Sequence, residues 1–167
     1  MGLMHRSLHG LSRVNFISDK KKLEYFPPFF LMRIKVLDLG DNWNHIRIKL
    51  PLNWRSANAA GNMFGGYQAS LADPIPALAC LKLFPGYRVA TKSLAVNFLL
   101  VGNSNLTLHF DFDDQLKQTI ENDLAERGRS TPTFTMTLVR EDGKVCTQIT
   151  NTVAIRPKGY ITPLDQE

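Results

Sequence analysis

An apolar stretch near the middle of the chain, residues 66–84, restricts the fold more than any other feature of the sequence. It is too long for a strand and apolar on every side, which is typical of a helix that the rest of a domain surrounds. Pro74 and Pro76 interrupt the stretch, so we expect the helix to kink or break near Asp73. The sequence therefore predicts a central buried helix that is not continuous.

Alternation of apolar and polar residues predicts strands on both sides of this helix. Before it, two such runs flank the turn Gly40-Asp41-Asn42 and predict a hairpin. After it come four more runs, and Asp142-Gly143 between the last two predicts another hairpin. The apolar residues expected to face inward are Met32, Ile34, Val36, Ile46, Ile48, Leu50, Ala90, Leu94, Val96, Phe98, Leu100, Leu106, Leu108, Phe110, Phe112, Phe134, Met136, Leu138, Val145, Ile149, Val153 and Ile155.

Two further helices complete the expected elements. Ser18 is suited to cap a short helix over residues 19–26, which Pro27 and Pro28 end. The other helix carries one apolar stripe, lies between the second and third of the later strands, and ends near Gly128. This order predicts an α+β fold, a largely antiparallel sheet wrapped around a central helix. Such a sheet needs a cover for its edge or its other face, so we expect an oligomer.

The length of 167 residues indicates one domain, which we place at residues 18–167 after a flexible or amphipathic leader, residues 1–17. The leader is free of acids and weakly resembles a mitochondrial presequence. Two cysteines are too few for a secreted disulfide framework or a zinc cluster, which favours a reducing compartment. We therefore expect a cytoplasmic protein, with the mitochondrial matrix as the alternative if the leader is a presequence.

The net charge of +5 is unevenly placed, at +6 for residues 1–55 and −1 for residues 56–167. A basic first third attracts nucleic acid, acidic lipid or a phosphorylated small molecule, or it is simply a solvated face. No nucleic-acid-binding motif accompanies the charge, so no nucleic-acid partner is expected. No apolar run approaches the length of a transmembrane helix, so no transmembrane segment is expected either.

Asp73 is the only charged residue between Ser56 and Leu81. An isolated carboxylate inside an apolar helix is costly unless it finds donors, and such residues cluster at functional sites. The alternative is a capping carboxylate for the segment that restarts at Pro74. Eight residues upstream, Gly65-Gly66 lies at the expected start of the helix, where unpaired amides can hold an oxyanion or the glycines merely allow tight packing.

The run from Asn58 to Asp73 resembles the Asn-x-x-Gly…Gly-Gly-x6-Asp signature of the PaaI-like acyl-CoA thioesterases, which have the hot-dog fold. Met-Phe-Gly-Gly, Ala-Asp-Pro and Thr91-Lys92-Ser93 also resemble a poorly characterised branch of that superfamily. The resemblance spans residues 27–157. It implies a single hot-dog domain whose protomers pair edge to edge, as a homodimer or as a dimer of dimers (a homotetramer), with active sites at the dimer interface.

The resemblance also implies the chemistry of the site. The amides of Gly65 and Gly66 would hold the oxyanion, and Asp73 would activate water to hydrolyse an acyl-CoA thioester. Coenzyme A would enter only as part of the substrate, so we expect no separate cofactor and no metal. The alternative is a protein that binds acyl-CoA or a fatty acyl group without catalysis.

Seven other residues are candidate substrate contacts. Asn58 and Asn62 bind the ligand or order their loop, and Phe64 stands where PaaI-like enzymes usually carry a histidine. Lys92 contacts a coenzyme A phosphate or neutralises Asp73, or its ammonium simply reaches solvent. The first turns of the central helix carry Tyr67, Gln68 and Ser70, which line the acyl pocket or take part in ordinary packing.

Overall fold

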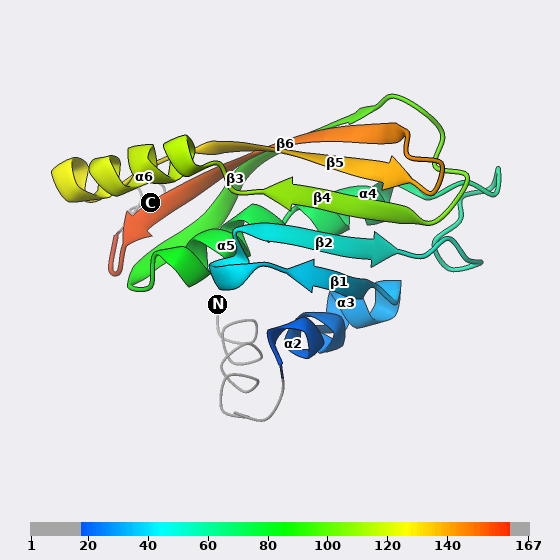
Figure 1. The fold of residues 1–167 in the computed structure, drawn as a ribbon, viewed down its shortest axis with the longest axis horizontal. Coiled ribbons are helices and arrows are strands. Elements are labelled where there is room, and N and C mark those ends of the chain that lie inside the picture. The colour runs from blue at the N-terminus through cyan, green and yellow to red at the C-terminus, as the bar shows by residue number, and fades with distance from the viewer. Residues whose placement is uncertain (1–17, 161–167) are drawn as a thin grey trace, which may run out of the picture.

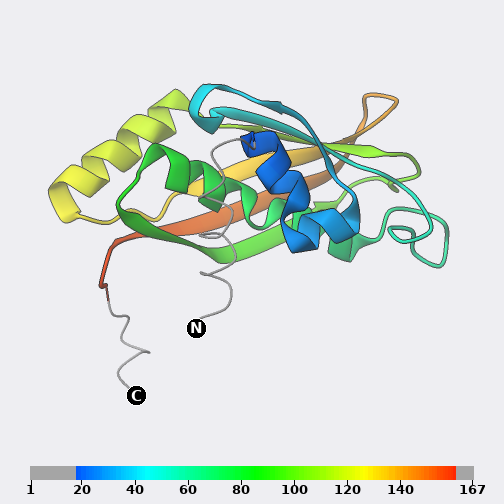
Figure 2. The same cartoon turned by 90° about the horizontal axis from the view of Figure 1, so that it is seen from below.

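The computed structural model describes residues 18–160, so the expected leader at residues 1–17 lies outside it. Six antiparallel strands form one sheet in the order β1-β2-β4-β5-β6-β3. Helices α4 and α5 run along one face of this sheet (Figures 1 and 2). The strands are β1 Lys35–Leu39, β2 His45–Leu50, β3 Tyr87–Phe98, β4 Leu106–Asp111, β5 Thr133–Arg140 and β6 Val145–Pro157. The predicted α+β architecture is confirmed, as are both hairpins.

The central helix is broken where the prolines predict it. Helix α4 is Gly65–Ala72 and helix α5 is Ile75–Leu83. Since proline has no amide hydrogen, the carbonyl groups that precede the break lose their usual donors. At the break itself two side chains bond to the main chain: Asn151 Nδ2 donates to the Asp73 carbonyl over 2.8 Å, and Thr91 Oγ1 donates to it over 3.0 Å. The break is thereby tied to strands β6 and β3.

Strand β3 contains a β-bulge that reverses which of its side chains face inward. Thr91 pairs with Val153 and Ser93 with Thr152, which leaves Lys92 as the extra residue. Tyr87, Val89 and Thr91 are half-buried before the bulge, and Leu94 and Val96 after it. The expectation that Ala90 shares a face with Leu94 is therefore wrong, and Ala90 is exposed.

The N-terminal helices depart from expectation at one point. Ser18 caps α2 (Asp19–Tyr25) by accepting from the Lys21 amide, as predicted. A strand was expected to begin by Met32, but Pro27–Met32 forms a second helix, α3. Proline disrupts a helix interior yet is well accommodated in the first turn, so Pro27 and Pro28 end α2 and begin α3 together. Helix α2 packs against β1, the edge strand opposite β3.

The core lies between the sheet and the central helix and is rich in aromatic rings. Phe110, Phe112 and Phe134 contact one another in pairs, with ring centroids 5.1 to 6.0 Å apart. Phe84, at the end of α5, reaches Phe112 at 6.5 Å. The last helix, α6 (Asp114–Arg127), begins at the cap Asp113 and ends at Gly128, whose backbone is left-handed. It covers one end of the sheet through Ile120 and Leu124.

Candidate functional site

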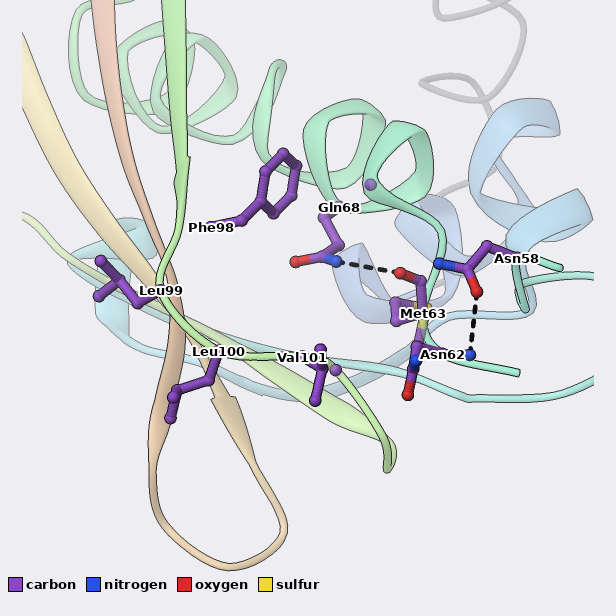
Figure 3. A pocket seen from close by; sticks show the side chains of 10 residues that line it. Asn58, Asn62, Met63, Gln68, Phe98, Leu99, Leu100 and Val101 are labelled. Carbon is purple, nitrogen blue, oxygen red and sulfur yellow. Dashed lines mark hydrogen bonds between the residues drawn. The ribbon is translucent and has the colours of Figure 1, made fainter. Parts of the chain in front are cut away.

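A pocket of about 400 Å³ opens where the N-terminus of α4 faces the end of β3 (Figure 3). One wall comes from the loop before α4, one from the first turn of α4, and one from the segment that leaves β3. The lining combines apolar side chains with three carboxamide side chains and main-chain groups. Its residues are Asn58, Asn62, Met63, Gly65, Gln68, Phe98, Leu99, Leu100, Val101 and Gly102.

The start of α4 offers main-chain donors to this pocket. Phe64 is the N-cap and supplies no side-chain cap. Among residues 18–160, the amides of Gly65 and Gly66 have no hydrogen-bond acceptor, whereas the amides of Tyr67 and Gln68 already bond to the Phe64 carbonyl. Unpaired amides at the positive end of a helix dipole favour an anion or a polarised carbonyl oxygen.

Aromatic rings lie against both glycines. A Cβ at Gly65 would lie 2.8 Å from Cζ of Phe98, and a Cβ at Gly66 would overlap the ring of Phe64. The absence of these two Cβ atoms lets the rings reach the helix backbone. The Phe64 ring is half exposed and packs edge-to-face on Tyr67, with centroids 6.2 Å apart.

The side chain of Gln68 connects the pocket wall to the sheet. It is buried, its Nε2 donates to the Met63 carbonyl over 3.3 Å, and its Oε1 accepts from Thr147 Oγ1 over 2.5 Å. A buried carboxamide with partners on both sides holds the loop, α4 and β6 in one arrangement. The pocket is therefore a preformed part of the fold.

Asn58 and Asn62 shape the loop and face the pocket together. The Asn58 Oδ1 accepts from the amides of Ala60, over 3.0 Å, and Asn62, over 3.1 Å, which is the Asx pattern of a tight turn. The predicted turn-ordering role is confirmed for Asn58. Both residues nevertheless line the pocket, so either carboxamide is placed to contact a ligand (Figure 3).

Asp73 is not buried, contrary to the expectation for a lone acid in an apolar helix. Eight residues of helix, about 12 Å along the axis, separate it from Gly65. The helix break turns its side chain outward, and among residues 18–160 its carboxylate forms neither a hydrogen bond nor an ion pair. Capping is also absent, since the N-cap of α5 is Pro74 with no side-chain hydrogen bond. The carboxylate is thus free beside strand β3.

Two further candidate substrate contacts, Lys92 and Ser70, also lie outside the pocket of their own protomer. Lys92 is exposed on the β3 bulge and forms no ion pair within residues 18–160, and Ser70 is exposed on α4. Neither lines the pocket. Of the predicted site residues, one protomer therefore brings Gly65, Gln68, Asn58 and Asn62 together in the pocket. The others do not line it: Gly66, Phe64, Tyr67, Ser70, Asp73 and Lys92.

Six pocket residues were not predicted as site residues. They are Met63 before α4 and, at the end of β3 and just after it, Phe98, Leu99, Leu100, Val101 and Gly102. A signal for the four apolar residues from Phe98 to Val101 is present, because this run breaks the alternation of β3. Gly102 is recognisable only from the contact it makes. Its carbonyl accepts from the Met63 amide over 2.7 Å, and this bond closes the pocket floor.

Within residues 18–160, no group of three or more His, Cys, Asp or Glu side chains is placed to hold a metal ion. No helix in that part of the chain is long and apolar enough to cross a membrane.

A six-stranded antiparallel sheet around a central helix is the arrangement of the hot-dog fold. Solved structures with this fold include the P. aeruginosa protein PA5026, called a protein of unknown function and probable thioesterase, with a TM-score of 0.74 at 18% identity over 83% of this chain and 93% of that one. They also include thioesterase HI1161 from Haemophilus influenzae, with a TM-score of 0.65 at 20% identity over 83% of this chain and 89% of that one. A mutant of thioesterase PA1618 from P. aeruginosa has a TM-score of 0.66 at 19% identity over 86% of this chain and 97% of that one. No protein-family model and no curated protein matches the sequence.

Gly102→Ala is expected to lower the free energy of unfolding by about 1–3 kcal/mol. A Cβ there would lie 2.9 Å from Met63 Cβ, an atom too close to its backbone to move aside. Chemical denaturation followed by circular dichroism measures this change. Asn103→Ala, at the exposed neighbouring position, is the matched control and is expected to be neutral. Equal stability of both variants would mean that the Met63–Gly102 contact is not tight.

Both cysteines are expected to be inert to a thiol-trapping dye in the native protein. Cys80 and Cys146 are fully buried, and burial raises the pKa of the Cys80 thiol to about 12. Burial also raises the pKa of Cys146. Since the thiolate is the reactive form, neither should react until the chain unfolds. Absorbance with and without denaturant tests this, and rapid labelling of the native protein would contradict the packing around α5 and β6.

Proposed function

We propose that the protein hydrolyses an acyl-CoA or related acyl thioester at sites formed between two copies of the chain. The observation that carries the proposal is the unpaired amide of Gly65, which lines the pocket, beside the unpaired amide of Gly66 at the start of α4. The amides would bind the thioester carbonyl and the oxyanion that forms on attack. The pocket would take the acyl group. Similarity to proteins called thioesterases supports the same class of reaction.

The general base in this proposal is Asp73 of the neighbouring copy. Within one protomer the carboxylate lies outside the pocket, too far along α4 to serve the Gly65 of its own chain. It lies beside β3, because Thr91 of that strand bonds to its main chain. Pairing of β3 with β3 of a second copy would cover the carboxylate and direct it toward the other protomer. It would then take a proton from the attacking water.

Strand β3 is suited to such pairing. It is twelve residues long, lies at an edge of the sheet, and has only β6 as a strand partner within residues 18–160. Long unpaired edges are normally covered. The apolar residues at its end and just after it, from Phe98 to Val101, are exposed in one protomer, which fits burial by a second copy. Lys92 lies on the same edge, where its ammonium would meet a phosphate of coenzyme A or the partner carboxylate.

The remaining candidate contacts would bind the substrate around this centre. Asn58 and Asn62 would bond to amides of the thiol arm, and Phe64 with Tyr67, beside the glycines at the start of α4, would cover it. Ser70 would face the arm on the outer side of α4.

A survey of acyl-CoA thioesters with a thiol-trapping dye, run beside a mass measurement in solution, tests the proposal. The expected result is thiol release and a particle near 38 kDa, twice the 18.9 kDa of one chain, or near 76 kDa for a dimer of dimers. A particle of one chain would contradict an interfacial site.

The second candidate is an acyl-CoA or fatty-acyl binding protein without catalysis. Its supporting observation is that Asp73 lies outside the pocket of its own protomer. It predicts thermal stabilisation by acyl-CoA with no thiol release, since a ligand that binds only the folded state raises the melting temperature.

A further inference from the structure

We propose that α2, α3 and the start of β1 form a surface that docks on bilayers of anionic phospholipid. We call it the α2–α3 face and define it by the apolar residues Tyr25, Phe30 and Leu31 and the cations Lys21, Arg33 and Lys35. It lies at the β1 edge of the sheet, opposite β3 (Figures 1 and 2). Docking there would not compete with pairing of β3, and the inference does not depend on the proposed hydrolase activity.

Helix α3 lacks the polar side that a surface helix normally has. All six of its residues, Pro27–Met32, are apolar. Phe29 and Met32, one turn apart, are buried in the core, so Phe30 and Leu31 must point outward. They are 59% and 63% exposed, beside Tyr25 at 53%. In an ordinary soluble helix polar residues occupy such positions.

Cations surround these side chains. Lys21, Arg33 and Lys35 line a hollow of about 280 Å³ with Tyr25 and Phe30. The only acid there is Glu24, which already accepts from Lys21 over 2.6 Å and from the Val36 amide over 3.1 Å. Arg33 forms no ion pair with any residue in the range 18–160. The hollow therefore has a net charge of +2 and lies next to three protruding apolar groups.

This combination fits a bilayer surface better than other partners. Aromatic and aliphatic groups enter the boundary of the acyl chains while adjacent lysine and arginine side chains meet the lipid phosphates. A second copy related by a two-fold axis would set two such cationic hollows against each other. A nucleic acid has phosphates but no apolar layer for Leu31 and Phe30.

Co-sedimentation of the full chain with large unilamellar vesicles tests the proposal. Binding is expected to vesicles of phosphatidylcholine mixed with phosphatidylglycerol, to weaken with salt, and to be far weaker on phosphatidylcholine alone. The double variant Phe30→Ser/Leu31→Ser should bind about tenfold or more weakly. Lys21→Ala, which keeps the apolar groups, should bind roughly fivefold more weakly.

The matched control removes two apolar side chains elsewhere, Leu81→Ser on α5 with Val145→Ser on β6, both also exposed. It should bind like the unaltered chain, and circular dichroism should show all variants folded. Unchanged binding of Phe30→Ser/Leu31→Ser would overturn the proposal, since another part of the chain would then hold the vesicle. A changed particle size of the double variant would also overturn it, because the face would then be a contact between copies. DNA binding that survives the double substitution and displaces the vesicles would overturn it as well.

Discussion

Replacing Asp73 with Asn is expected to lower kcat for thioester hydrolysis by about 100-fold or more, the usual effect of losing a general base. Asparagine has nearly the same shape but cannot accept a proton from water. The folded state should not suffer, because the carboxylate is exposed and has no partner within residues 18–160, while the structural bonds from Asn151 and Thr91 go to the main chain. Steady-state kinetics and a melting curve on the same sample separate the two effects.

The matched control is Asp114→Asn, which removes another exposed carboxylate, in the first turn of α6. It should leave kcat unchanged. If Asp73→Asn turns over as fast as the unaltered chain, Asp73 is not the base. If neither variant nor the unaltered chain releases thiol but all bind acyl-CoA, the binding function is correct instead.

Mixing two inactive variants tests whether the site joins two copies. Gly65→Val would block the pocket mouth, because even a Cβ there approaches the Phe98 ring, while Asp73→Asn removes the base. If Gly65 of one copy works with Asp73 of the other, each mixed dimer has one intact site. Random reassociation of equal amounts should then restore about a quarter of the full rate. No recovery, with mixed dimers shown by mass, would place both residues in one chain.

The sequence predicted the fold well because its signals are local and strong. The apolar stretch, Pro74 and Pro76 are sufficient to predict a broken central helix, and alternation locates the buried faces of β2, β4 and β5. The face of β3 was not predictable, since the bulge at Lys92 depends on how β3 registers with β6 rather than on its own residues. Helix α3 was missed because Pro27-Pro28 reads equally as an end and as a beginning.

The candidate site was predicted only in part, because the burial of Asp73 depends on tertiary structure and on pairing with a second copy of the chain. Gly65 and the two asparagines sit near one another in the sequence, and the fold brings them to one pocket. Asp73 was expected to be buried because its neighbours in sequence are apolar. Burial, however, depends on which side of α4 a residue faces, and the break turns this one outward. Periodicity cannot show whether a second copy of the chain covers it.

Phe110→Ala is expected to lower the free energy of unfolding by about 3–5 kcal/mol, the largest effect on stability expected here. The side chain is fully buried between the sheet and the central helix, and its ring centroid lies 6.0 Å from Phe112 and 5.8 Å from Phe134. Removal of the ring leaves a cavity, and β4 cannot move to close it without distorting its pairing with β2 and β5. Urea denaturation gives the change as a lower midpoint with an unchanged slope.

Phe30→Ala makes the same substitution on a ring that is mostly exposed, so in the absence of lipid it should change stability by no more than about 0.5 kcal/mol. The same atoms are removed in both variants. The difference between their changes in the free energy of unfolding therefore measures the effect of burial at a fixed side-chain type. The Phe110 ring does not line the pocket, so Phe110→Ala should keep the thioesterase activity of the unaltered chain below its own melting temperature. Equal stability of the two variants would show that Phe110 is not part of a packed core and that the register of β4 is wrong.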